Sequence, residues 1–300
     1  LVSNSLLKKE PESMEERFYY HLIHSACAIL NKEQEVAYWH SSFLISIFEN
    51  QHWLIKDSVW QKRRGSVIDN HFLICTELSK TDEAERTFAL MRDQPEQVLP
   101  LSQKYTNLLE ALAKKGLFEN ARPYLQEIEE LISTKGDKMD ENVLSVLYLN
   151  MCIAYFGSGQ YKKSLKSVNQ LLNKKDSFMR EDLVSMAHLI NLIIHFELGN
   201  EDLLPYRIKS ARRFLNKKNR IYKFEEAFLT FVEKKLLLAF TAEEQKQSFV
   251  QLLKELEIIL LDPFEKQIEH YFDFLAWVTG KIQNKSLALV LQNKKSSANS

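Results

Sequence analysis

Residues 148–172 read YLNMCIAYFGSGQYKKSLKSVNQLL, and this stretch decides the fold. Its apolar and aromatic residues recur at three- and four-residue spacing on both sides of the polar turn at 157–160, which predicts two amphipathic helices. Because a connection this short leaves no room for a crossover, the two helices must run antiparallel. The stretch is therefore expected to form one helical hairpin.

The same order of residues recurs along the chain. Residues 105–128, YTNLLEALAKKGLFENARPYLQEI, place aromatic, apolar, glycine, aromatic and small residues in matching positions, 43 residues earlier. A weaker third copy, which includes His188, Gly199 and Ala211, follows about 40 residues after the second. A period of this size is that of a helical hairpin, so the sequence predicts a repeat protein.

Each recurring residue has a mechanical role in such a hairpin. Gly116, Gly159 and Gly199 are expected to take the left-handed conformation that ends the first helix of each pair. A small residue in the second helix, Ala121 or Ser164, would let the two helices approach closely. The same turn is thus encoded three times.

The composition supports an all-helical chain. Among 300 residues there are only 7 glycines and 6 prolines, against typical frequencies of about 7% and about 5%. Sheet-rich and nucleotide-binding folds use glycine for tight turns and phosphate loops, so the shortage argues against both. A hydrophobic share of 45% and a charged share of 27% predict a soluble chain with a sizeable core.

Neither secretion nor membrane insertion is expected. The first residues contain no apolar run of signal-peptide length, and the most apolar window, 183–196, is interrupted by histidine and asparagine. Cys27, Cys75 and Cys152 lie far apart in apolar stretches and are interpreted as buried thiols. They fit a reducing compartment, so we expect a cytoplasmic protein.

The two clearest units resemble the tetratricopeptide repeat family. The unit that begins at Tyr148 matches the family's order of aromatic, small and glycine residues most closely, and the resemblance is specific from about 103 to 212. The spacing of 40 to 43 residues exceeds the family's usual period of about 34. The turn proline that typically closes a unit is also absent, so longer helices or longer inter-unit turns are implied.

The resemblance implies an all-α, right-handed α-solenoid of antiparallel helical hairpins with about 40 residues per repeat. We expect one solenoid over residues 1–292, closed by a capping helix at 264–282, because an end unit otherwise exposes its apolar face. Residues 293–300 are expected to be a disordered tail.

If the chain follows the family, the first helix of each hairpin lines a concave groove. The candidate groove residues are Gln103, Thr106, Asn107, Glu110, Leu149, Asn150, Ile153, Leu189 and Ile193. Only two of them, Asn107 and Asn150, suit a clamp for a terminal carboxylate, and the cationic residues that such a clamp needs are missing. The apolar members would accept an amphipathic helix. Alternatively, tight curvature buries them against neighbouring hairpins.

A second candidate surface is basic, although the 40 basic and 40 acidic residues of the whole chain balance. Residues 206–223 contain eight positive charges and no acid. The candidate residues are Arg207, Lys209, Arg212, Arg213, Lys217 and Lys218. This stretch is a solvated or inter-unit face, a contact for an acidic protein, or a contact for nucleic acid, and the thin supply of aromatic residues disfavours the last.

No catalytic or metal-binding motif is found. There is no phosphate-binding loop and no H-E-x-x-H. His21, His24 and Cys27 are three residues apart, a spacing that turns the side chains progressively around a helix instead of onto one face. The four tryptophans are expected mainly in the core. The sequence therefore predicts neither an enzyme nor a bound cofactor or metal.

These observations favour a non-catalytic scaffold that binds a peptide or helix of a partner protein in the concave groove. The alternative is the sensory or regulatory C-terminal region of a larger nucleic-acid-linked regulator that uses the basic 206–223 surface; the first residue is Leu, which fits a piece of a longer protein. We expect a protein partner, no membrane contact, and a monomer or homodimer.

Overall fold

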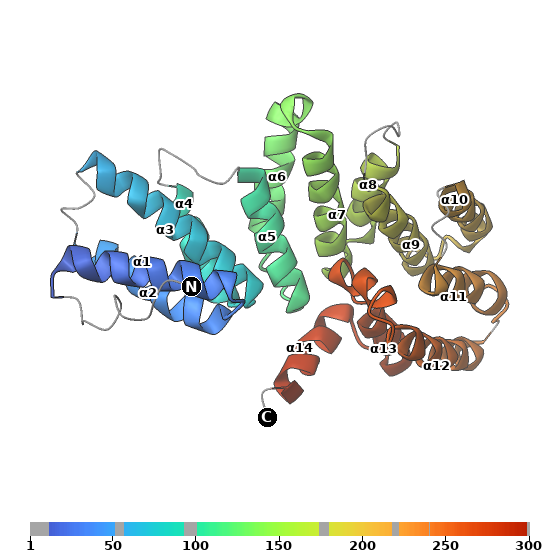
Figure 1. Cartoon of the computed structure of the whole chain (residues 1–300). Helices are drawn as coiled ribbons and strands as arrows, with labels where there is room; N and C mark the ends of the chain where they lie inside the picture. Colours follow the sequence, from blue (N-terminus) through green and yellow to red (C-terminus); the bar gives the residue numbers. More distant parts are fainter. Residues whose placement is uncertain are drawn as a thin grey trace. The chain divides into compact units, whose positions relative to one another are not determined.

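The computed structural model describes residues 12–51, 57–92, 101–173, 180–217, 222–239 and 241–298 (Figure 1). Within these ranges the chain forms α-helices and short 3-10 or π turns and contains no strand, which confirms the all-helical prediction. The chain divides into two compact units, Leu1–Ala111 and Leu112–Ser300. Each unit is described by itself, and the single solenoid over 1–292 stays a prediction.

The first unit consists of helices that pack on their neighbours in sequence. Its helices are α1 (Met14–Leu30), α2 (Gln34–Asn50), α3 (Ser58–Glu77), α4 (Thr81–Arg92) and most of α5 (Leu101–Lys114). Ser13 and Glu16 form a capping box that starts α1, and the Asp57 side chain accepts hydrogen bonds from the first amides of α3. The helices α1 and α2, α2 and α3, and α3 and α4 lie against each other. Phe18, Phe72 and Phe88 are among their buried side chains.

The second unit continues the same plan. Its helices are α6 (Arg122–Lys135), α7 (Glu141–Gly157), α8 (Tyr161–Leu172), α9 (Glu181–Glu197), α10 (Leu204–Lys217), α11 (Lys223–Phe231), α12 (Ala242–Ile259), α13 (Phe274–Gln283) and α14 (Leu287–Ala298). Successive helices pack together from α6 to α10 and again from α11 to α14, and α9 also contacts α11. One hydrophobic core runs through the unit, from Phe118 to Leu291.

The predicted glycine turns are confirmed. Gly116, Gly159 and Gly199 have φ angles of 69°, 72° and 68°. In each turn the amide after the glycine donates to a carbonyl five residues back, as Gln160 does to Tyr155 at 2.8 Å. These bonds satisfy carbonyls that the end of the helix would otherwise leave unpaired.

The same turn occurs twice in the first unit without glycine. Lys32 joins α1 to α2 with φ of 62°, and Ser79 joins α3 to α4 with φ of 54°. Their neighbours Glu33 and Lys80 donate backward with the same hydrogen-bond pattern, each at 2.8 Å. The hairpin pattern therefore begins at α1, earlier than the glycine residues indicate.

A small residue does bring two helices together where the sequence predicts it. The Ser164 hydroxyl on α8 donates to the Cys152 carbonyl on α7 at 2.8 Å, and Ser164 is fully buried. The Phe118 ring lies against Gly157, where an added Cβ would come within 2.4 Å of the ring. At these two places, Ser164 and Gly157, a small residue therefore allows close packing.

The C-terminal region differs from the prediction of one capping helix at 264–282. Residues 265–270 form a 3-10 segment, and α13 starts only at Phe274, because the Asp273 side chain accepts the Ala276 amide at 2.7 Å and caps the helix there. The expected tail at 293–300 is also corrected, since α14 continues to Ala298. Buried Val290 and Leu291 hold its first turns against the unit.

Candidate functional site

The predicted apolar groove is not a free surface. Leu149, Ile153, Leu189 and Ile193 are at most 5% exposed and belong to the core of the second unit. The helices α7, α8 and α9 pack closely enough that these side chains fill the space between hairpins. The groove prediction is therefore wrong at these four positions, and the alternative that the residues are buried is correct. Asn150 is buried as well.

The polar groove candidates lie on α5, in the first unit. Thr106 is buried, whereas Asn107 and Glu110 are half-buried. Gln103, which is exposed, donates to the Asn107 side chain at 2.8 Å. The neighbouring Lys104 is 1% exposed. The structure therefore leaves part of this polar face accessible and buries the rest.

Lys104 forms a buried ion pair that fixes α5 on α3. Its Nζ lies 2.8 Å from Oδ1 of Asp69, and both side chains are almost fully enclosed. Removing one partner of such a pair leaves an uncompensated charge in the interior. The pair is a structural tie within the first unit.

The basic 206–223 stretch is partly neutralised. Arg212 lies 2.7 Å from Glu226 and 3.2 Å from Glu233. The hydrogen bond that Arg212 donates to the Glu226 carboxylate is the largest cause of the raised pKa of Arg212. The sequence could not show this pairing, because both acids follow the stretch on the next elements.

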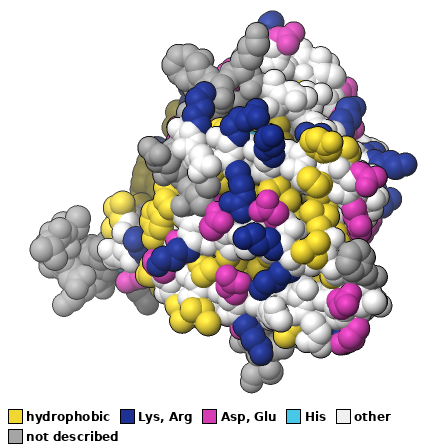
Figure 2. All heavy atoms as spheres, turned by 90° about the vertical axis from the view of Figure 1, so that its right-hand side faces the viewer, with side chains coloured by type: hydrophobic (Ala, Val, Ile, Leu, Met, Phe, Trp, Pro, Cys, Tyr) yellow, Lys and Arg dark blue, Asp and Glu magenta, His cyan; other side chains and the backbone are white. Residues whose placement is uncertain are grey.

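Four of the candidate basic residues are exposed to solvent. Arg207, Lys209, Arg213 and Lys217 on α10 are exposed, and Lys218 lies outside the described residues. Tyr206 beside them is 73% exposed. On the face shown in Figure 2, basic side chains lie between acidic and apolar ones and do not form an unbroken patch.

The hairpin of α1 and α2 carries an exposed apolar surface that the sequence did not indicate. We call it the α1–α2 face, and its members are Tyr19, Ile23, Leu30, Val36 and Trp39. Leu30 is 82% exposed and Trp39 is 60% exposed, although the tryptophans were expected mainly in the core. Large exposed apolar side chains of this kind are buried in many contacts between proteins.

A histidine cluster lies between α1 and α2. Nδ1 of His21 is 2.9 Å from Nδ1 of His40, and the His24 ring stacks on His40. Burial, followed by repulsion from its histidine neighbours, lowers the pKa of His40 to about 4. Cys27 is exposed, so the expectation that its thiol is buried is wrong. Among the described residues, no group of three or more potential ligands is arranged to hold a metal.

A second polar network resembles a catalytic triad in its contacts. The Ser41 hydroxyl lies 2.8 Å from Nδ1 of His71, and Nε2 of His71 lies 3.3 Å from Oε1 of Glu83. However, Ser41 and His71 are at most 1% exposed, so a substrate has no access to them. The network ties α2, α3 and α4 together, and burial lowers the pKa of His71.

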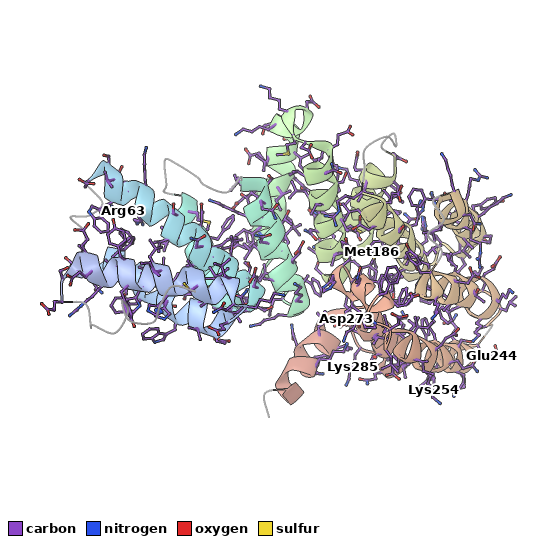
Figure 3. All side chains as sticks on the ribbon, in the orientation of Figure 1. Arg63, Met186, Glu244, Lys254, Asp273 and Lys285 are labelled. Atoms are coloured by element: carbon purple, nitrogen blue, oxygen red, sulfur yellow. The ribbon has the colours of Figure 1, made fainter. Side chains whose placement is uncertain are left out.

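The second unit contains at least three cavities, two of which lie between several elements. The larger, about 580 Å³, is lined by the turns after α5 and α7 and by α13 and α14, and includes Lys285 (Figure 3). The other, about 410 Å³, lies between the N-terminal ends of α9 and α11 and the 3-10 segment 265–270. We call it the 265–270 cavity. Met186 on α9 contributes to its lining (Figure 3).

These features describe an all-helical protein in which many helices pack on their neighbours in sequence, with exposed apolar and basic side chains. No described helix has the length and apolar character that crossing a membrane requires. No family model matches the sequence, and no curated protein matches it.

A solved structure is similar in fold. The crystal structure of the apo form of RapI matches with a TM-score of 0.56 over 93% of this chain and 99% of that chain. Only 14% of the aligned residues are identical. The similarity therefore concerns the course of the helices and does not extend to any site.

Proposed function

We propose that this chain is a tetratricopeptide-like α-solenoid that acts as a non-catalytic, cytoplasmic protein-interaction module. Five hairpin turns with the same geometry, at Lys32, Ser79, Gly116, Gly159 and Gly199, support the repeat assignment. The similarity in fold to RapI supports it independently. Cys27, Cys75 and Cys152 are all free thiols, which agrees with a reducing compartment.

The α1–α2 face carries the proposal of a protein partner. Trp39 and Leu30 expose most of their surface to water, and burying such side chains contributes roughly 1.5–3 kcal/mol each. Aromatic residues dominate the energetics of many protein interfaces. The apolar side chains that were predicted to line a groove are buried in the core and cannot contact a partner. We therefore place the proposed contact on the α1–α2 face.

The test introduces negative charge on the exposed apolar surface. A variant with Trp39→Glu and Ile23→Glu should lose partners that the wild-type chain captures from the source cell, because glutamate must then be desolvated in the interface. Tyr206→Glu is the matched control, since Tyr206 is an exposed aromatic residue on the second unit. Partners retained by the double variant, with helicity unchanged in circular dichroism, would exclude the α1–α2 face.

A second candidate function rests on the exposed cations of α10. Arg207, Lys209, Arg213 and Lys217 could contact phosphates as part of a nucleic-acid-linked regulator. Replacing these four residues by alanine should abolish a salt-sensitive shift of duplex DNA in a gel. An unchanged shift, or none with the wild-type chain, removes this candidate.

A further inference from the structure

The 265–270 cavity has the size and composition of a ligand site. Its volume of about 410 Å³ falls within the roughly 300–1,000 Å³ of typical small-molecule pockets. Met186 and Phe224, both almost fully buried, and half-buried Ile268 supply apolar lining. The cavity lies wholly within the second unit, between three elements that the core holds in place.

The polar lining includes three carboxylates beside the neutral side chains of Ser185, Tyr222, Gln267 and Tyr271 and the imidazole of His270. Asp182, Glu225 and Glu265 line the cavity, and no lysine or arginine is among its lining residues. Glu225 and Glu265 are each only 7% exposed. Carboxylates held in a partly apolar cavity interact with an incoming cation more strongly than they would in water.

Two of these carboxylates are fixed in position. The oxygens of Glu265 accept the backbone amides of Lys223 and Phe224, each at 3.1 Å, which caps the start of α11. Asp182 accepts hydrogen bonds from Arg180 and from the Tyr271 hydroxyl. These bonds outweigh burial and lower the pKa of Asp182, so it stays ionised.

Aromatic rings complete the lining. The rings of Tyr222 and Phe264 meet edge to face with centroids 4.8 Å apart, and Phe264 is 51% exposed. The face of an aromatic ring attracts a cation, particularly one that has lost part of its water. Carboxylates together with aromatic faces recognise an organic cation and disfavour an anion.

We propose that the 265–270 cavity binds a primary amine or guanidinium, with the charged head near Glu225 and Glu265 and the apolar stem against Met186 and Phe224. The same chemistry is offered by a lysine or arginine side chain of a polypeptide and by a free polyamine-type metabolite. The site is in the second unit, so its failure would leave the proposed protein contact at the α1–α2 face untouched.

Calorimetric titration of the full chain tests the proposal. Three probes are used. Nα-acetyl-arginine amide represents an arginine residue in a polypeptide, and agmatine represents a free organic cation. Nα-acetyl-citrulline amide is a neutral isostere of the arginine amide. At least one of the two cations should bind with Kd at or below about 1 mM, and its affinity should fall as the salt concentration rises. The citrulline amide should bind at least about tenfold more weakly than the arginine amide.

The pattern of binding identifies the source of the ligand. Binding of the arginine amide points to a polypeptide side chain, and binding of agmatine alone points to a free cation. Absence of binding by both cations overturns the proposal, as does equal binding of the arginine and citrulline amides.

Adjacent glutamates give a matched pair of variants. Glu225→Gln should weaken binding of the cation by about tenfold or more, because a charge-assisted contact is lost. Glu226→Gln should leave it unchanged, since Glu226 pairs with Arg212 and does not line the cavity. Phe264→Ala, at an exposed ring, provides a second test if Glu225→Gln does not fold. Wild-type affinity in both Glu225→Gln and Phe264→Ala would contradict the assignment.

Discussion

Gly116, Gly159 and Gly199 have nearly equal φ angles. Alanine variants at these positions therefore separate the free-energy cost of a steric clash with α14 from the cost of backbone strain. An alanine at Gly159 or Gly199 would meet no atom within 4 Å, whereas at Gly116 its Cβ would lie 2.6 Å from the Ala288 carbonyl oxygen on α14. A non-glycine residue in the left-handed conformation costs roughly 1–2 kcal/mol. All three variants share this cost, but only Gly116→Ala must also displace the backbone of α14.

The added cost of forcing atoms into a packed site is roughly 1–3 kcal/mol. Because about 1.4 kcal/mol corresponds to a factor of ten, Gly116→Ala should make amide hydrogen exchange in α14 roughly 5- to 150-fold faster than Gly159→Ala does. The Gln292 side chain, which donates to the Gly116 carbonyl at 2.9 Å, should be released as well.

Hydrogen exchange measured by mass spectrometry resolves this difference, because peptides from α14 can be followed separately from those of α8. Equal exchange of α14 in Gly116→Ala and Gly159→Ala would refute the contact between α14 and the turn after α5. Faster exchange in both helices of both variants would show that strain alone decides the outcome.

Three further results are expected. Lys104→Met should destabilise the chain by about 3–5 kcal/mol in urea unfolding, because it removes the positive charge that balances the buried Asp69 carboxylate. The additional change Asp69→Leu should restore most of the loss, and a double variant as unstable as the single one contradicts this. Because the pKa of His40 is lowered to about 4, the unfolded chain binds more protons than the folded chain between pH 6.5 and about 4. The contribution of His40 to stability should therefore be full above pH 6.5 and fall toward pH 4. His40→Phe should flatten this dependence in thermal melts, and an unchanged slope would exclude His40 as the cause. Burial raises the pKa of Cys152 to about 12, so iodoacetamide should label exposed Cys27 and leave Cys152 unlabelled in the folded chain. Labelling of both cysteines at equal rates would disagree with the structure.

The repeat could be predicted wherever a turn depends on one residue type. Gly116, Gly159 and Gly199 were readable because only glycine takes a positive φ at little cost. The turns at Lys32 and Ser79 have the same geometry but no local indication, since the packing of α1 to α4 imposes it on residues that do not prefer it. The glycines therefore revealed three turns, whereas the turns of the same geometry at Lys32, Ser79 and Asn284 were not predicted.

The candidate surfaces were harder to predict, because exposure depends on which helices become neighbours. Leu149 and Trp39 both sit among apolar residues in the sequence, yet Leu149 is 1% exposed and Trp39 is 60% exposed. The 265–270 cavity joins residues about 80 positions apart, such as Asp182 and Glu265, and no local pattern connects them. A stripe of apolar residues identifies a helix face, but a partner helix decides whether that face meets water.

Helical periodicity, scarce glycine and the recurring turn were enough to determine that this chain forms repeated antiparallel hairpins, because these properties act over a few residues. Only the tertiary structure decided that the apolar first-helix positions are core, that Arg212 is neutralised by Glu226, and that α14 rests on the turn after α5. Those outcomes depend on contacts between distant segments, whose free energies appear only after the hairpins have packed.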